Sequence, residues 1–495
     1  MHLSKSLYIR GRQCIKALWL KKYKQDVLIP PSSSTEAIFD TGNLVGNLAC
    51  KLFPNGKNVP DVGTTFEEKA KLTKEWLSKG ATNIYEATFE YDGIIIIVDI
   101  LHINSDGNVE IFEVKSSTSI KNKNVYIDDV SIQYYVLDNL GYKIDRTCIV
   151  HLNKEYIKGD ELDINELFSI VDIQDKVIKL QQDIPEKLNY FEKFLDDKDN
   201  EPNIEIGVHC NIPYDCDGID YCWKHIPQNS IFDISGLRKN KKFKLYNDGI
   251  ITFEQITDYS PFSESQRIQI ESECNNKTMI DKVAIKKFID TLTYPIYYLD
   301  FETFQQAVPQ WEGVKPYAQL PFQYSLHIEY EDGKLEHKEF LAKEGIDPRY
   351  EIAKRLVEDI PRNVTVLAYN MSFEKAIIDK LAKEYEEFRD DLCMIHNNIK
   401  DLMIPFKSKY YYTPAMKGSY SIKYVLQALV PEITKSYKDL DCVQNGKEAM
   451  QIYAKLSDIE NKEKVVQHRD ALLEYCKLDT LAMVKILKKL KETIN

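Results

Sequence analysis

The order of apolar and polar residues predicts a chain in which β-strands and amphipathic helices alternate. Two apolar runs within residues 84–115, separated by the turn sequence 104–108, predict a hairpin of buried strands. Further strand patterns at 296–301 and 322–330 lie on either side of a long loop. Amphipathic helices are predicted after them, and the last covers residues 471–490. The pattern therefore indicates an α/β protein.

The same patterns separate the chain into three regions. Residues 1–230 hold the β-rich sequence and close on a cluster of cysteines, residues 231–290 are polar and helical, and residues 291–495 begin with the second strand pattern. A chain of 495 residues exceeds the usual size of one domain, about 100–200 residues. We therefore interpret the regions as an N-terminal domain, a helical connector and a C-terminal domain.

Composition narrows the class of protein. With 43% hydrophobic and 29% charged residues, the chain has the composition of a folded, water-soluble protein and not of a disordered one. Its net charge of −12 argues against a basic protein that coats nucleic acid, although a local basic groove is compatible with it. The N-terminus lacks a signal-peptide pattern, and no apolar run approaches the roughly 20 residues of a membrane-spanning helix. We expect a cytoplasmic protein with reduced thiols and no membrane partner.

The first group of candidate functional residues lies on the predicted hairpin. Strand pairing would set Asp99 beside Glu113, and Lys115 shares the face of Glu113 because the two are two residues apart. Carboxylates that hold Mg²⁺ or Mn²⁺, with a lysine that orients or activates the nucleophile, are what metal-assisted phosphodiester cleavage requires. Glu86 is a further candidate acid, and Gln133 on the next helix could contact a metal-bound water or a phosphate. A solvent-facing hairpin is the alternative interpretation.

This arrangement resembles the PD-(D/E)XK nucleases of the RecB type, which also place a glutamine on the helix after the ExK strand. The resemblance implies a nuclease fold for residues 1–230, with the hairpin residues and Gln133 in its active site. The family usually has a histidine after a glycine on an early helix, where residues 42–46 offer none. It usually has a tyrosine four residues after the glutamine, where Leu137 stands here. Both departures are compatible with reduced or unusual activity.

A short segment contains three cysteines, Cys210, Cys216 and Cys222, among turn-forming residues. In a reducing cytosol they do not indicate a disulfide scaffold, and the odd number calls for a fourth ligand, for which Cys14 is the best candidate. RecB-type domains with an iron–sulfur cluster have an isolated cysteine at this N-terminal place, so the resemblance implies a four-iron, four-sulfur (4Fe-4S) cluster. Zinc is the alternative, with His209 able to replace Cys14. The scattered cysteines are expected to be ordinary thiols: Cys50, Cys148, Cys274, Cys393, Cys442 and Cys476.

A second group of acidic residues is predicted in the C-terminal domain. An apolar strand leads into Asp300 and Glu302, which share a face because they are two residues apart. Glu374 lies at the start of a helix, and Tyr475 and Asp479 lie one turn apart on the last helix. If the fold brings the acids together, they suit the two-metal mechanism, in which cations activate a water and stabilise the leaving oxygen. Tyr475 would orient that water, and chance placement is the alternative.

The order of these motifs resembles the DnaQ-like 3'–5' exonucleases of the RNase H fold, in their tyrosine-bearing DEDD subgroup. The resemblance implies that the four acids hold Mg²⁺ or Mn²⁺ in a domain spanning residues 291–495. Glu374 stands where most members have aspartate, and Asp401 is the alternative fourth acid. Residues 417–423 could hold phosphates through backbone N–H groups at a helix start, or form an ordinary helix cap.

The two halves in this order resemble an uncharacterised bacterial family that fuses a RecB-like iron–sulfur nuclease domain to a DnaQ-like domain. The resemblance implies a metal-dependent nuclease that acts on DNA, single-stranded or at ends, through a 3'–5' exonuclease site and a second, N-terminal nuclease site. One alternative is a DNA-end binding protein whose N-terminal site has decayed and whose exonuclease alone is active; another is an RNA exonuclease. The basic run at 238–244 is typical of a solvated linker and is also compatible with binding to a DNA backbone.

Overall fold

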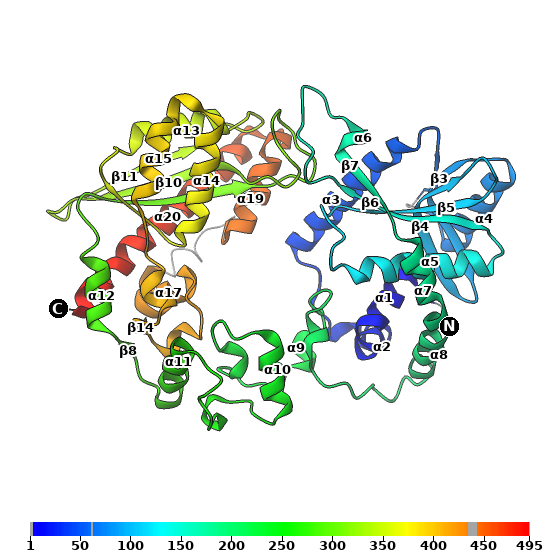
Figure 1. The fold of residues 1–495 in the computed structure, drawn as a ribbon, viewed down its shortest axis with the longest axis horizontal. Coiled ribbons are helices and arrows are strands. Elements are labelled where there is room, and N and C mark those ends of the chain that lie inside the picture. Colours follow the sequence, from blue (N-terminus) through cyan, green and yellow to red (C-terminus); the bar gives the residue numbers. More distant parts are fainter. Residues whose placement is uncertain (1–2, 61–62, 434–442, 495) are drawn as a thin grey trace. The chain divides into compact units, whose positions relative to one another are not determined.

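The chain forms two compact units (Figure 1). The computed structural model describes residues 3–60, 63–433 and 443–494, so that Cys442 lies outside the described residues. Unit 1 comprises Met1–His225 and Gln306–Ala318, and unit 2 comprises Ile226–Gln305 and Gln319–Asn495. Each unit combines helices with a β-sheet, which confirms the mixed α/β class.

Unit 1 is built on a seven-stranded sheet. Its strands are β1 (Leu3–Ser4), β2 (Lys57–Asn58), β3 (Asn83–Tyr91), β4 (Ile94–Ile103), β5 (Val109–Lys115), β6 (Ile144–Leu152) and β7 (Phe168–Asp172). Strands β3, β4 and β5 form an antiparallel meander, and β6 pairs parallel to β5. The β4–β5 turn contains Gly107 at a φ of +78°, which glycine adopts without steric cost. The predicted hairpin is confirmed.

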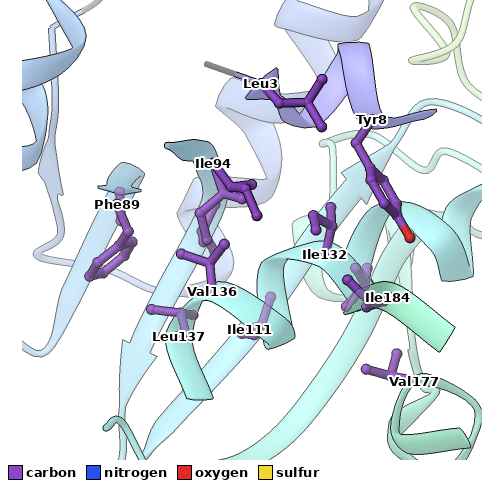
Figure 2. Close-up of a cluster of buried hydrophobic side chains, with 14 of the residues drawn as sticks. Leu3, Tyr8, Phe89, Ile94, Ile111, Ile132, Val136, Leu137, Val177 and Ile184 are labelled. Atoms are coloured by element: carbon purple, nitrogen blue, oxygen red, sulfur yellow. The ribbon is translucent and has the colours of Figure 1, made fainter. Parts of the chain in front are cut away.

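Helices cover the sheet of unit 1. They are α1 (Lys5–Gln13), α2 (Ile15–Tyr23), α3 (Ser33–Ala49), α4 (Phe66–Ser78), α5 (Asn124–Asn139), α6 (Ile164–Leu167), α7 (Gln174–Leu180), α8 (Ile184–Leu195) and α9 (Ile219–Cys222). Figure 2 shows Ile132, Val136 and Leu137 of α5 beside Ile94 and Ile111 of the sheet, in the main hydrophobic core. Each such side chain stabilises the fold by about 1.5–3 kcal/mol when fully buried. This packing holds α5 against the strands that carry the first group of candidate residues.

The segment 306–318 is distant in sequence from the rest of unit 1 but packs as part of it. The backbone N–H of Lys158 donates to the carbonyl of Val314 at 3.1 Å, and that of Gly313 donates to the carbonyl of Lys158 at 2.8 Å. Ala307 is buried in a second hydrophobic cluster of the unit, which includes Phe112. The sequence pattern predicts only a long loop here, and the structure assigns that loop to unit 1.

Unit 2 is built on a five-stranded mixed sheet in the order β11-β10-β9-β12-β13. The strands are β9 (Ile296–Phe304), β10 (Leu320–Glu329), β11 (Leu335–Leu341), β12 (Thr365–Ala368) and β13 (Ile399–Asp401), and a separate two-stranded ribbon joins β8 (Met279–Ile280) to β14 (Tyr411–Tyr412). The central strand β9 pairs antiparallel to β10 and parallel to β12. The two strand patterns predicted around the long loop are confirmed as β9 and β10.

The two faces of β9 pack against different helices. Unit 2 contains α10 (Lys239–Asn247), α11 (Glu264–Asn275), α12 (Lys282–Ile289), α13 (Arg349–Asp359), α14 (Met371–Glu384), α15 (Arg389–Asn398), α16 (Ile404–Lys407), α17 (Ile422–Leu429), α19 (Gly446–Lys455) and α20 (Lys462–Ile494). Tyr297 and Leu299 share a core with α13, α14 and α15, whereas Ile296 and Tyr298 share one with α12, α17 and α20. Even-numbered residues of β9 therefore face the long C-terminal helix, which contains the helix predicted at 471–490.

The predicted connector is helical and belongs to unit 2. Its first part has a hydrophobic core of its own, formed by Ile231, Ile234, Leu237, Phe253, Ile256, Phe262 and Ile270. Antiparallel pairing of Ser230 with Thr252 closes this small subdomain. Throughout the described part of the chain, every helix is too short or too polar to cross a membrane.

Candidate functional site

Three carboxylates meet beneath the C-terminal helix of unit 2. Asp300 and Glu302 project from β9, and Asp479 projects from α20. Each offers an oxygen that lies within 4.8 Å of the oxygens of the other two. Among the described residues, this is the one group of three His, Cys, Asp or Glu side chains that meets this distance. The structure thus brings together three of the four predicted acids from positions far apart in the sequence.

Helix α20 is held in place by contacts on both sides of this cluster. The side-chain amide of Gln323 on β10 donates to the carbonyl of Leu472 at 2.8 Å. The thiol of Cys476 lies 3.8 Å from both the carbonyl and a carboxylate oxygen of Asp300. Thr480, next to Asp479, contacts the hydroxyl of Ser325 at 2.7 Å. These contacts fix the helical turn that carries Asp479 against the strand that carries Asp300.

The cluster is electrostatically unfavourable without a cation. Burial and the charges of Asp479 and Glu302 raise the pKa of Asp300 well above its ordinary value. Burial, together with the charge of Asp479, raises the pKa of Glu302 to about 8. The pKa of Tyr475 is raised by burial, by the neighbouring acids and by a hydrogen bond with Asp479. A bound cation would relieve this repulsion, because it favours the ionised form of each carboxyl.

The two alternatives for a fourth acid are placed differently. Glu374 is 2% exposed, near the start of α14, and its Oε2 has no hydrogen-bond partner within the described structure. Its charge is one of those that raise the pKa of Asp300. Asp401 instead uses one oxygen to accept from the backbone N–H groups of Asn370 at 3.0 Å and Met403 at 2.9 Å. Asp401 is thereby engaged in backbone structure, and Glu374 retains a free oxygen.

The predicted residues of unit 1 also come together. Asp99 accepts from the backbone N–H of Val114 at 2.7 Å, which places it beside the Glu113 strand. Lys115 donates to Glu113 Oε1 at 2.6 Å, and Gln133 of α5 donates to Glu113 Oε2 at 2.7 Å. Glu113 is 1% exposed, so burial raises its pKa to about 7, with contributions from neighbouring acids.

Two further charged residues belong to this site and were not predicted. Lys5, the first residue of α1, donates to both carboxylate oxygens of Glu113 at 2.9 and 3.0 Å and lies 3.2 Å from Asp129. Asp129 accepts from Lys115 at 2.6 Å. Burial alone would raise the pKa of Asp129, but the charges of Lys115 and Lys5 hold it well below its ordinary range. Two lysines thus occupy the space among the carboxylates.

Glu86, the remaining predicted acid, has an exposed side chain on β3. It lies between the pairs Tyr85–Ile100 and Ala87–Val98, opposite Asp99 on β4, and has a positive φ of 57°. Burial and, to a lesser extent, the charge of Glu86 raise the pKa of Asp99, while Lys5 and Lys115 act in the opposite direction. Glu86 therefore borders the group from the neighbouring strand.

The four predicted cluster cysteines line one small cavity of unit 1, about 20 Å³ in volume. Cys14 lies between α1 and α2, and the others lie between residues 210 and 222. The side-chain amide of Gln13 donates to the carbonyls of His209 at 2.8 Å and Tyr214 at 2.7 Å. Arg10 pairs with Asp217 through two bonds of 2.7 and 2.8 Å. These contacts fasten the N-terminal helices to the cysteine segment.

The spacing of these thiols bears on the metal they could hold. Tetrahedral zinc, with Zn–S bonds of about 2.3 Å, brings its sulfur atoms to about 3.8 Å from one another. No three of the four thiols, all within the described ranges, have sulfur atoms within 4.8 Å of one another. His209 makes side-chain hydrogen bonds with Cys14 and Cys210, which raise its pKa to about 10. The four thiols are more widely spaced than a zinc site requires, and the His209 imidazole lines the same cavity.

The other described cysteines have no comparable neighbours. Cys50, Cys148, Cys274, Cys393 and Cys476 are free thiols, and none of them lines the cavity. Burial raises the pKa of Cys50 and of Cys148 to about 11, so both stay protonated at neutral pH. Cys476 is set apart by its contact with Asp300.

Comparison with known proteins finds similarity over parts of the chain. A domain of unknown function, DUF2779, matches residues 297–421. This range includes Asp300, Glu302, Glu374 and Asp401 and ends before α20. The chain is 26% identical over 245 residues to the uncharacterized protein UU173 of Ureaplasma parvum serovar 3 (strain ATCC 700970), an alignment that covers 45% of the chain. The aligned region is 34% of that relative, so the chain spans about a third of its length.

Proposed function

We propose that this protein is a metal-dependent nuclease that hydrolyses phosphodiester bonds of DNA through a 3'–5' exonuclease site in unit 2. The observation that carries the proposal is the convergence of Asp300, Glu302 and Asp479 within 4.8 Å. Buried acids this close are costly unless a cation or a proton offsets them. A mixed sheet whose central strand carries the acid pair is compatible with the RNase H fold expected from the DnaQ-like motifs.

The donor set fits Mg²⁺ or Mn²⁺, which prefer carboxylate oxygens. Asp300, Glu302 and Asp479 would hold the cations, and Glu374, whose Oε2 has no hydrogen-bond partner in the described structure, would be the further ligand. When bound, such cations lower the pKa of water and offset the charge that develops on the phosphate. Tyr475, hydrogen-bonded to Asp479, would orient the attacking water.

The test is degradation of end-labelled single-stranded DNA in the presence of Mn²⁺. We expect Asp300→Ala to reduce the rate by at least 100-fold, because the cluster loses a ligand that the other acids cannot replace. Glu336→Gln is a matched control, since it neutralises a partly exposed acid on neighbouring β11, paired with Lys334, and should leave the rate unchanged. Cleavage by Asp300→Ala as fast as by the wild type would overturn the proposal. RNA of the same sequence, measured in parallel, separates a DNA exonuclease from an RNA exonuclease.

For unit 1 we propose a second nuclease site of the PD-(D/E)XK type. Its support is the assembly of Asp99, Glu113, Lys115 and Gln133 around one buried carboxylate. Lys5 favours the competing function, a DNA-end binding site that has lost cleavage, because its ammonium group occupies the neighbourhood of Glu113. Lys115→Ala in the Asp300→Ala background distinguishes the two. Loss of a residual Mn²⁺-dependent cleavage supports the nuclease, whereas DNA binding without residual cleavage supports the binding site.

We further propose that Cys14, Cys210, Cys216 and Cys222 hold a 4Fe-4S cluster that links both ends of the sequence of unit 1. Four thiols around one cavity, more widely spaced than zinc requires, support this cofactor. Anaerobically purified protein should absorb broadly near 400 nm, as iron–sulfur thiolate charge transfer does. A colourless protein that contains one equivalent of zinc would establish the alternative cofactor.

A further inference from the structure

Helix α10 carries a concentration of positive charge that contrasts with the chain as a whole. Arg238, Lys239, Lys241 and Lys244 are exposed, and their side chains make no ion pair with any residue that the structure describes. No acidic residue occurs between Arg238 and Asn247. The chain carries a net charge of −12, so this helix locally reverses the sign of the surface.

The orientation of α10 is fixed by its opposite face. Phe243 is buried and packs against Phe232 at a ring separation of 5.3 Å, and Tyr246 packs against the same ring at 6.0 Å. Lys242 turns inward, where its ammonium group donates to the carbonyl of Phe232. Lys241 and Lys244 lie three residues apart, so they are neighbours on the outward face. The positive charges are therefore displayed by an element anchored in a hydrophobic core.

We propose that the outward face of α10 binds the phosphate backbone of a nucleic acid strand. The inference rests on the proposed function only in its choice of partner, because the charge and exposure of α10 are independent of the carboxylate cluster. Exposed Asn240 and Asn247 add amide donors of the kind that contact phosphate oxygens. The exposed residues of this helix are all polar, whereas a surface that inserts into lipid carries apolar side chains beside its basic ones. A polynucleotide backbone fits this combination best.

The test measures binding without cleavage. Fluorescence anisotropy of a labelled single-stranded oligonucleotide is recorded with the full chain in EDTA, over a range of salt concentrations. Lys241→Ala/Lys244→Ala should weaken binding about tenfold at low salt. It should also reduce the slope of log K against log salt by about 1.4, the value for two lost phosphate contacts on a single strand. The loss should be equal for different sequences, because backbone contacts carry no base information.

A matched control removes the same charge elsewhere. Lys71 and Lys74 on α4 are also exposed and three residues apart, but α4 carries Glu67, Glu68 and Glu75 as well. Lys71→Ala/Lys74→Ala should therefore leave both affinity and slope unchanged. An unchanged slope in the α10 variant, or an equal loss in both variants, would overturn the proposal. The proposal would also be overturned if the protein bound anionic vesicles or polyglutamate more tightly than oligonucleotides.

The same experiments separate this inference from the proposed nuclease activity. Suppose that the wild type fails to cleave DNA with Mn²⁺ while the α10 variant binds DNA more weakly than the wild type. In that case the binding surface is supported and the proposed nuclease activity is not. If the wild type cleaves DNA and the α10 variant binds as tightly as the wild type, the nuclease stands and the binding surface fails. Circular dichroism of both double variants confirms that the substituted helices remain folded.

Discussion

Glu302 and Glu374 hold their protons far more tightly than surface carboxyls do. Burial raises the pKa of each to about 8, and the charge of Asp479 adds to the effect on Glu302. At pH 7 and without a cation, both groups are therefore largely protonated. Cation binding must displace these protons, so the affinity of the cluster for metal should rise with pH.

The stability of the metal-free protein should carry the opposite pH dependence. The pKa of Glu302 is 4.5 for the free side chain and about 8 in the folded protein, so the folded state binds the proton more tightly. This stabilisation is complete below about pH 4.5 and is lost as pH rises through 8. Between pH 5 and 9, in EDTA, Tm of the wild type should fall relative to that of Glu302→Gln.

Thermal denaturation at a series of pH values measures this difference. Glu336→Gln serves again as control. Lys334 holds the pKa of the Glu336 carboxyl below its ordinary value, so the group stays ionised between pH 5 and 9 and should leave the pH profile unaltered. Saturating Mn²⁺ should invert the trend, since ionised carboxylates then gain a partner. Parallel pH profiles for the wild type and Glu302→Gln in EDTA would contradict the assignment of Glu302 to a proton-binding cluster.

Lys5 is expected to exclude cations from the site of unit 1, because its ammonium group bonds both oxygens of Glu113. Lys5→Ala should lower the free energy of unfolding by about 3 kcal/mol, as the loss of one partner from a buried ion pair does. It should also tighten Mn²⁺ binding to unit 1 at least tenfold. Calorimetric titration in the Asp300→Ala background measures the affinity, with Lys5→Arg as the charge-preserving control. Equal Mn²⁺ affinity in all three proteins would show that Lys5 does not block the site.

The turn before α17 is tightly constrained by backbone geometry. Gly418 has a φ of +72°, and a Cβ at this position would lie 1.9 Å from the carbonyl oxygen of Asp233. Its N–H donates to the hydroxyl of Tyr412 at 2.9 Å. Only glycine suits this position, where the turn packs against the small subdomain of unit 2.

Gly418→Ala should therefore destabilise unit 2 by more than about 3 kcal/mol, because strain adds to a backbone clash. Gly333→Ala is the matched control. Gly333 also has a positive φ, of 85°, but a Cβ there would meet nothing within 4 Å. Gly333→Ala should lower the free energy of unfolding by only about 1 kcal/mol, which is the cost of placing a residue with a Cβ at a positive φ. Denaturant unfolding compares the two, and similar costs would argue against the close packing at Gly418.

Sequence patterns predict those parts of the sites that depend on local geometry. Asp300 and Glu302 could be assigned to one face because side chains on a strand alternate with a period of two. Asp129 lies one helical turn before Gln133 and could have been found from that spacing. Lys5 could not be predicted, because it reaches Glu113 across 108 positions through the packing of α1. The placement of residues 306–318 in unit 1 likewise depends on tertiary contacts that leave no periodic signal.

At the scale of the whole molecule, the two units have separate hydrophobic cores. A substitution that destabilises one unit should therefore leave the stability and activity of the other unchanged. Cys14→Ser should abolish absorbance near 400 nm and lower Tm of unit 1, because the proposed cluster would lose the ligand that adds to the Gln13 and Arg10 contacts between the N-terminal helices and the cysteine segment. DNA degradation that depends on Asp300 should continue. Cys393→Ser, at an exposed free thiol, should change neither property. Undiminished absorbance in Cys14→Ser would remove Cys14 from the set of ligands.

The assignment of residues 306–318 to unit 1 has a consequence for synthesis on the ribosome. The first stretch of unit 1 ends at His225, and its last contribution ends at Ala318, about 90 residues later. At roughly 5–20 residues per second, translation leaves unit 1 incomplete for about 5–20 s. During that interval the apolar surface that later covers Ala307, including Phe112, lacks its partner. Chaperones can therefore bind this apolar surface of the nascent chain for a limited time. That time ends only after the first strand of the sheet of unit 2 has been translated.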